Sequence, residues 1–358
     1  MNHTSRTDKL RSVLQENEID ALLVTSLTNV RYLTGFSGSN GQVLVWSDGV
    51  TFFSDGRYAA RATSLVQGAD IEIYPTRLSD KLPPLLKRAE LERIGVEGAT
   101  MTLAERDDLA GRLDGATLHP TQGLVEDLRR TKDADEVALI REAVKISDDT
   151  FTWIQERLVP GALEREIELE LEVRMRQTGA DEVSFQPIVG SGPLSAHIHH
   201  TASDRAFEKG DMVLLDFGSR VGGYCSDMTR TVVLGPATEQ QEEIYDLVLR
   251  SHLAGIEAVA PGASGKEVDA AARSIIEDAG HGERFAHGLG HGIGIDIHEA
   301  PRFSKTSDDS LRVGDVVTVE PGVYLPDWGG IRIEDCVLVT EGGYEVLGNS
   351  PKDHLISV

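Results

Sequence analysis

The feature that most constrains this chain is an internal repeat in its carboxyl-terminal part. Each copy opens with Pro-Gly-Ala, continues with Glu and an aliphatic residue, and reaches a glycine after the same interval: Pro160, Glu166 and Gly179 in the first copy, and Pro261, Glu267 and Gly280 in the second. A repeat with matched intervals predicts that the two copies fold into equivalent supersecondary units that pack against each other.

Each copy also contains a strand-like segment that leads to an acidic residue. The segments 210–218 and 314–322 align, and in both an apolar run reaches an acid, with a second acid beyond a glycine-containing turn. The four acids are Asp216 and Asp227 in the first copy and Glu320 and Glu334 in the second. Each half is therefore predicted to form a β-ribbon that carries two carboxylates.

Helix signals support the same division. Thr238–Gln241 and Ser264–Glu267 both match a capping box that opens an amphipathic helix. We predict an α+β domain of two related halves, with a central curved antiparallel sheet and helices packed outside it.

The amino-terminal part has a different pattern, in which short apolar runs alternate with helical patterns. Strands are predicted at 21–24, 43–46, 51–54 and 94–97, and strands separated by helices indicate an α/β domain. A charged amphipathic helix predicted over 128–145 marks the change of character. We place the domain boundary there, giving domains 1–131 and 132–358.

Composition limits the classes of partner. With 35 basic and 59 acidic residues the net charge is −24, which disfavours binding to nucleic acid or to anionic lipid surfaces. No apolar run approaches the roughly 18 residues of a membrane span. The polar amino terminus lacks the pattern of a secretion signal, and two cysteines, Cys225 and Cys336, suit a reducing compartment. A cytoplasmic location is expected.

The acids are candidate metal ligands because they end apolar strands, where an ionised carboxylate is costly without compensation. His291, in the glycine-rich run 287–294, adds one imidazole. The predicted ligands are Asp216, Asp227, His291, Glu320 and Glu334. Strand alternation puts Arg332 on the same face as Glu334, so Arg332 is expected to orient that carboxylate.

Five ligands suffice for two divalent cations if some carboxylates bridge them. One nitrogen donor and no thiolate favour Mn²⁺ or Co²⁺ over a structural zinc site, with Zn²⁺ left open. Two cations sharing a water would lower its pKa and create a hydroxide nucleophile, so hydrolysis is the predicted class of reaction. A single strand-end acid is more often a surface residue, and only the paired pattern supports this interpretation.

Five segments resemble the signature segments of the metallopeptidase family that includes aminopeptidase P, prolidase and methionine aminopeptidase. They are 215–218, 226–231, 288–294, 319–322 and 330–335. Segments 28–38 and 53–58 resemble the additional domain of the proline-specific members and creatinase. The resemblance implies a duplicated pita-bread catalytic fold, a dinuclear metal centre, specificity for proline and a homodimer formed through the amino-terminal domain.

The resemblance also implies roles for individual residues. Glu320 would act as general base as well as ligand, His199 and His298 would stabilise the oxyanion, and His287 and Arg332 would help to bind substrate. The family usually has Pro-His at the first catalytic histidine, whereas this chain reads Ala196-His197-Ile198-His199-His200. Counting back from Asp216 favours His199, and a slip of one residue would select His200.

The expected function is an Xaa-Pro aminopeptidase, which removes the residue before proline from a peptide with proline at its second position. The alternative is an Xaa-Pro dipeptidase, a prolidase, which must recognise the free carboxylate of proline. No inserted segment between Glu320 and Glu334 brings an additional arginine, which favours the aminopeptidase. A more remote alternative is a non-catalytic binding protein on the same fold, against which the intact ligand set argues.

Overall fold

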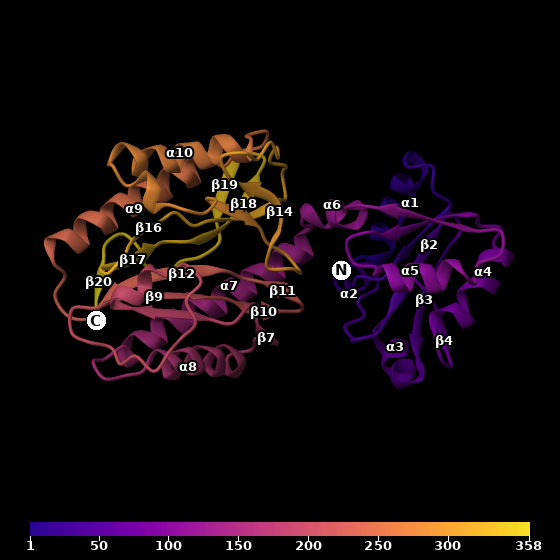
Figure 1. Ribbon diagram of the computed structural model, residues 1–358, viewed down its shortest axis with the longest axis horizontal. Coiled ribbons are helices and arrows are strands. Elements are labelled where there is room, and N and C mark those ends of the chain that lie inside the picture. The colour runs from indigo at the N-terminus through magenta and orange to yellow at the C-terminus, as the bar shows by residue number, and fades with distance from the viewer. The chain divides into compact units, whose positions relative to one another are not determined.

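The computed structural model describes residues 1–358, which form two compact units, Met1–Arg129 and Arg130–Val358 (Figure 1). No helix in either unit is long and apolar enough to span a membrane.

The first unit is built on a six-stranded mixed sheet with the strand order β4-β3-β2-β1-β5-β6. Its strands are β1 Ala21–Val24, β2 Gln42–Trp46, β3 Gly49–Asp55, β4 Asp70–Tyr74, β5 Arg93–Glu97 and β6 Thr117–Thr121. Its helices are α1 His3–Glu16, α2 Leu27–Thr34, α3 Ala59–Leu65, α4 Leu82–Arg88, α5 Leu103–Ala110 and α6 Leu124–Arg130, with short 3-10 helices η1 Gly56–Tyr58 and η2 Leu78–Asp80.

The four strands predicted for this unit are confirmed as β1, β2, β3 and β5. Strands β4 and β6, which were not predicted, occupy the two edges of the sheet. Both edge strands contain polar residues and are largely accessible to solvent, and β6 includes Pro120. Edge strands of this kind lack the continuous apolar run that identified the central ones.

The second unit contains the repeat. Its strands are β7 Glu182–Val183, β8 Ile188–Ser191, β9 Met212–Phe217, β10 Ser219–Val221, β11 Tyr224–Cys225, β12 Met228–Val233, β13 Gly290–Gly292, β14 Glu299–Phe303, β15 Val316–Val319, β16 Gly322–Leu325, β17 Gly329–Arg332, β18 Asp335–Thr340, β19 Gly343–Val346 and β20 Ile356–Ser357. Its helices are α7 Ala134–Ile154, α8 Glu164–Gln177, α9 Glu239–Glu257 and α10 Gly265–Asp278, with 3-10 helices η3 Gln155–Arg157, η4 Gly192–Ala196 and η5 Gly282–Arg284.

The strands of this unit form several small sheets rather than one continuous sheet. The two largest have the orders β20-β12-β9-β8 and β14-β13-β15-β18-β19, one from each half of the repeat apart from β20. All pairs are antiparallel except β12 with β20. Figure 1 shows α7 and α8 on one side of these strands and α9 and α10 on the other, so helices cover the strands from outside as predicted.

Backbone hydrogen bonds confirm the repeat at atomic level. The amide of Gly161 donates to Phe207 O, and that of Gly262 donates to Leu311 O, both over 2.8 Å. The reciprocal bonds, from Phe207 N to Ala162 O and from Leu311 N to Ala263 O, are also 2.8 Å long. Both predicted capping boxes are present, at Thr238 and at Ser264.

The helix predicted over 128–145 is wrong at its beginning. α6 ends at Arg130, and α7 begins at Ala134 behind Asp133, whose side chain accepts a hydrogen bond from Glu136 N over 2.9 Å. The charged pattern continues through this break, so periodicity alone did not reveal it. The capping box formed by Asp133 and Glu136 is the signal that sets the true start of α7.

Candidate metal centre

The ends of the duplicated strands meet at one cavity of about 730 Å³ in the second unit. Asp216 lies near the end of β9, opposite Thr229 of β12, and Asp227 immediately precedes β12. Glu320 follows β15, and Glu334 lies between β17 and β18. His291 is the central residue of β13, and all five predicted ligands line the cavity.

Three of these side chains come close enough to share one cation. Potential ligand atoms of Asp227, His291 and Glu334 all lie within 4.8 Å of one another. His291 Nε2 is 3.6 Å from Asp227 Oδ2 and 3.5 Å from Glu320 Oε1. The structure therefore brings the oxygen-rich set and its imidazole together as the repeat predicted.

The electrostatics of the cluster favour a bound cation. Burial, followed by repulsion from neighbouring carboxylates, raises the pKa of Asp227 and of Glu334 well above their usual values. Burial raises the pKa of Glu320 to about 8, while burial lowers that of His291 to about 4. In addition, Asp216 Oδ1 is buried without a hydrogen-bond partner. Neutral imidazole, crowded carboxylates and an unsatisfied oxygen fit divalent metal ions.

Arg332 lines the cavity together with Glu334, as the strand alternation predicted, but it makes no direct hydrogen bond to that carboxylate. It donates to Asp216 Oδ2 and, over 3.0 Å, to Thr229 Oγ1. Thr229 Oγ1 in turn donates to Glu334 Oε2 over 2.7 Å, so a threonine missed by the sequence analysis orients that carboxylate. Ile331 and Ile333 lie in the apolar core, so the predicted alternation holds, and only the direct contact between Arg332 and Glu334 is missing.

His287 belongs to a second short chain of hydrogen bonds. Its Nδ1 lies 2.8 Å from the carbonyl of Gly288 and its Nε2 lies 2.9 Å from Tyr324 Oη. Burial lowers the pKa of His287 to about 3, so the ring is neutral, donates through Nδ1 and accepts from Tyr324. Arg332 donates to the same Tyr324 oxygen over 2.9 Å. Tyr324 carried no signal in the sequence beyond its place in an apolar run.

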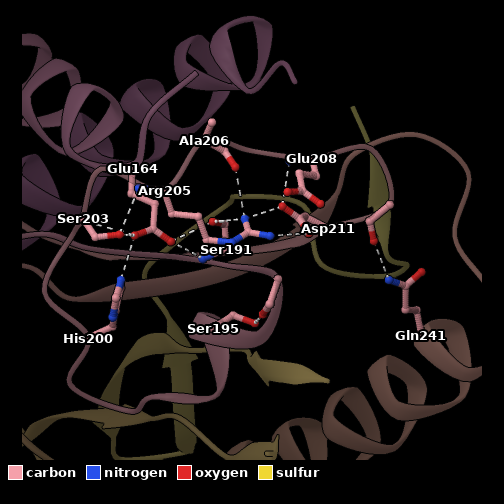
Figure 2. A network of polar contacts seen from close by, with 12 residues as sticks. Glu164, Ser191, Ser195, His200, Ser203, Arg205, Ala206, Glu208, Asp211 and Gln241 are labelled. Carbon is pink, nitrogen blue, oxygen red and sulfur yellow. Dashed lines mark hydrogen bonds and ion pairs between the residues drawn. The ribbon is translucent and has the colours of Figure 1, made fainter. Parts of the chain in front are cut away.

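The histidines of the loop 197–200 differ in their surroundings. His199 lines the cavity that also contains Asp216. His200 Nε2 instead lies 2.8 Å from Glu164 Oε2, as Figure 2 shows. His298 lies beside His291, with ring centroids 4.4 Å apart and nearly perpendicular planes. Both His199 and His200 line the cavity, but the ring of His200 is already engaged by Glu164, whereas no such contact holds His199.

The cavity also contains an arginine, Arg302, that was not among the predicted site residues. Arg302 of β14 is exposed, lines the cavity and pairs in register with His291 of β13. Burial is the main cause that lowers the pKa of His298, and the positive charge of Arg302 acts in the same direction. Phe185, Ile188 and Phe303 supply apolar wall. The positively charged guanidinium of Arg302 in a partly apolar cavity suits an anionic group on a small substrate.

The fold and the carboxylate cluster define a metal-dependent hydrolase with a duplicated catalytic unit, the pita-bread fold. Residues 138–341 match the model of metallopeptidase family M24, and residues 6–131 match the creatinase/prolidase N-terminal domain. The chain belongs to metallopeptidase family M24, whose members use divalent metal ions. The predicted family and fold class are thereby confirmed.

Full-length relatives have this architecture. The structure of an Xaa-Pro dipeptidase from Bacillus anthracis is 40% identical, with a TM-score of 0.96 and coverage of 99% of this chain and 100% of that chain. An X-Pro aminopeptidase from Thermotoga maritima is 32% identical, with a TM-score of 0.92 over 99% and 100% of the two chains. The Xaa-Pro dipeptidase of Pyrococcus furiosus is 35% identical over 98% of this chain and 99% of its own.

Proposed function

We propose that this chain is an Xaa-Pro dipeptidase, a prolidase, that hydrolyses the peptide bond of dipeptides ending in proline. Similarity to dipeptidases from Bacillus anthracis and Pyrococcus furiosus supports this alternative over the Xaa-Pro aminopeptidase that the sequence favoured. The similarity to an aminopeptidase from Thermotoga maritima, at lower identity, keeps that activity as the second candidate.

Arg302 is the observation that carries the preference for a dipeptide. The proline of an Xaa-Pro dipeptide bears a free carboxylate next to the scissile bond, whereas a longer peptide has a neutral amide there. A guanidinium binds a carboxylate through two parallel hydrogen bonds. In a prolidase such an arginine was expected between Glu320 and Glu334, but Arg302 at the cavity comes from β14.

Asp216, Asp227, His291, Glu320 and Glu334 would hold two divalent cations, with Mn²⁺ favoured and Co²⁺ or Zn²⁺ as alternatives. Such ions polarise a carbonyl and lower the pKa of water, which suits them to amide hydrolysis. The donor set supports oxygen-preferring Mn²⁺, because four of the five residues are carboxylates and none is a cysteine.

Side chains at the cavity have separate roles in the reaction. Glu320 accepts the proton of the attacking water, and His199 and His298 donate hydrogen bonds to the oxygen that becomes negative. His199 is favoured over His200 for this role because His200 is already bonded to Glu164. Tyr324 and Arg332 hold His287 in one orientation at the cavity, where it contacts the substrate.

The remaining expectations stay predictions. They are a homodimer, a cytoplasmic location, a domain boundary after residue 131, and the lack of nucleic-acid or membrane partners. Light scattering coupled to size exclusion tests the first of these.

The proposal is tested by hydrolysis of Ala-Pro beside Ala-Pro-Ala in the presence of Mn²⁺. Wild type should cleave the dipeptide, and Arg302→Ala should raise the KM for Ala-Pro by roughly tenfold or more while changing cleavage of the tripeptide little. Glu320→Ala serves as the inactive control. Cleavage of the tripeptide alone would instead establish an aminopeptidase, and equal inactivity of wild type and Glu320→Ala would indicate a non-catalytic protein.

A further inference from the structure

A buried carboxylate outside the cavity organises the loop that carries His199. Glu164 is the first residue of α8, and its side chain is 0% exposed. Its Oε1 accepts hydrogen bonds from Ser191 N over 2.8 Å and from Ser191 Oγ over 2.7 Å. Its Oε2 accepts from Ser203 N over 3.0 Å and from Ser203 Oγ over 2.6 Å, and lies 2.8 Å from His200 Nε2. Figure 2 shows these groups converging on the one carboxylate.

These hydrogen-bond partners of Glu164 lie at both ends of the segment that connects β8 to β9. Ser191 ends β8, whereas His200 and Ser203 lie on the loop that leads from β8 to β9. Two backbone bonds fasten the same part of the loop to α8, from Glu164 N to Arg205 O over 3.1 Å and from Arg165 N to Ser203 O over 3.2 Å. His199 lines the cavity, and the residue that follows it, His200, is held by Glu164.

A role in helix capping alone does not account for this arrangement. Acidic residues in the first turn of a helix are usually exposed and interact favourably with its positive end. Burying a carboxylate is costly unless its lone pairs are satisfied, and here five donors satisfy them. Burial opposes ionisation, but the bonds from Ser203, His200 and Ser191 outweigh it and lower the pKa of Glu164.

We propose that Glu164 is a positioning residue for the reaction, acting on His199 through His200 and Ser203. This inference rests on the proposed function, in which His199 stabilises the developing oxyanion. Glu164 does not line the cavity, and its side chain bonds to Ser191, His200 and Ser203 rather than to a proposed metal ligand. Its carboxylate determines where the backbone of His200 lies and hence how far the imidazole of His199 reaches into the cavity. Displacement of a catalytic group by about 1 Å is sufficient to lower turnover strongly.

The variant Glu164→Gln tests this directly, because it keeps the shape of the side chain but replaces one acceptor oxygen by a donor. We expect kcat for Ala-Pro to fall roughly ten- to a hundredfold, with KM and bound Mn²⁺ unchanged. The NMR signals of His199 in histidine-labelled protein, assigned with His199→Ala, should shift. Glu166→Gln is the matched control, because Glu166 is exposed on the same turn and glutamine also completes a capping box.

A double-mutant cycle separates positioning from a purely structural role. If Glu164 acts through His199, Glu164→Gln should change kcat by less than about twofold when His199 is already alanine. An equal loss of kcat in both backgrounds, or an unchanged kcat and unchanged His199 signals in Glu164→Gln, would overturn the proposal.

Two further outcomes, a Glu164→Gln variant that does not fold and an inactive wild type, can be told apart from a failure of the proposal. If Glu164→Gln does not fold, Ser203→Ala keeps the carboxylate and removes one donor, and should give a smaller loss of kcat together with a shift of the His199 signals. Normal kcat and signals in that variant would count against the proposal. If wild type hydrolyses neither peptide, the proposed function fails, whereas the NMR comparison still reports whether Glu164 places His199.

Discussion

The two halves of the catalytic unit have equivalent backbone hydrogen bonds but differ in the side-chain contacts at equivalent positions. Glu208 N donates to Asp211 Oδ2 over 2.8 Å, and Arg312 N donates to Asp315 Oδ2 over 3.0 Å. The two aspartates occupy equivalent turns before β9 and β15. However, Asp211 pairs with Arg205 of its own loop, whereas Asp315 pairs with Arg130 from the segment before α7. Equivalent carboxylates therefore anchor different parts of the chain.

The clearest difference lies at the start of the equivalent helices α8 and α10. Glu164 in the first half corresponds to Gly265 in the second, since both donate a backbone hydrogen bond to the following loop. A Cβ at Gly265 would lie 2.1 Å from Arg302 O, so the strand that carries Arg302 passes where a side chain would be. One half uses this position to hold the loop of His199, and the other uses it to admit the segment of Arg302.

Removing a carboxylate at the cavity should have the largest effect, whichever half supplies it. Glu320→Gln deletes the proposed base and should lower kcat/KM for Ala-Pro by about 10²- to 10⁴-fold. Asp227→Asn, from the other half, should also reduce bound Mn²⁺, which metal analysis of the purified protein measures. Glu341→Gln, an exposed acid in a turn, is the control and should retain activity. Full activity in Asp227→Asn would show that the halves do not contribute jointly.

The two anchoring ion pairs should differ in their contribution to stability. In the second half Asp315 is 0% and Arg130 6% exposed, so Asp315→Asn leaves a buried guanidinium uncompensated and should lower the free energy of unfolding by about 3–5 kcal/mol. In the first half Arg205 is 21% exposed, and water can partly replace Asp211 after Asp211→Asn. The loss should therefore be smaller. Urea denaturation of both variants measures the difference, and equal losses would contradict the comparison.

Gly265→Ala should destabilise the second half, because Gly265 has no room for a side chain, whereas the equivalent position in the first half carries Glu164. The added methyl group forces the backbone of Arg302 to move, with a loss of about 1–3 kcal/mol in stability and a raised KM for Ala-Pro. Thermal unfolding and steady-state kinetics measure the two effects. Gly342→Ala is the control, because nothing lies within 4 Å of a Cβ at Gly342. An unchanged KM in Gly265→Ala would separate the position of Arg302 from dipeptide binding.

Much of the fold was predictable because the repeat leaves local signals. The apolar runs identified the central strands, the capping boxes at Thr238 and Ser264 identified two helices, and matched acids indicated the residues that the structure brings together. Thr229, Tyr324 and Arg302 were not predictable in this way. Each acts through a partner distant in sequence, as Thr229 does with Glu334, and such pairs depend on which strands become neighbours. The break between α6 and α7 was missed because charged periodicity continues across it.

The smallest expected difference between the halves is a pH-dependent contribution to stability. Glu164 of the first half should make this contribution. Because the pKa of Glu164 is lowered below its ordinary value of 4.5 in the folded protein, its contribution to stability is present above that value and disappears as the pH falls through the folded pKa. Wild type should therefore exceed Glu164→Gln in thermal stability near neutral pH, and the gap should narrow below about pH 4.5. Gly265 gives the second half no such group. A gap that stays constant down to pH 3 would mean that the ionised carboxylate does not stabilise the loop of His199.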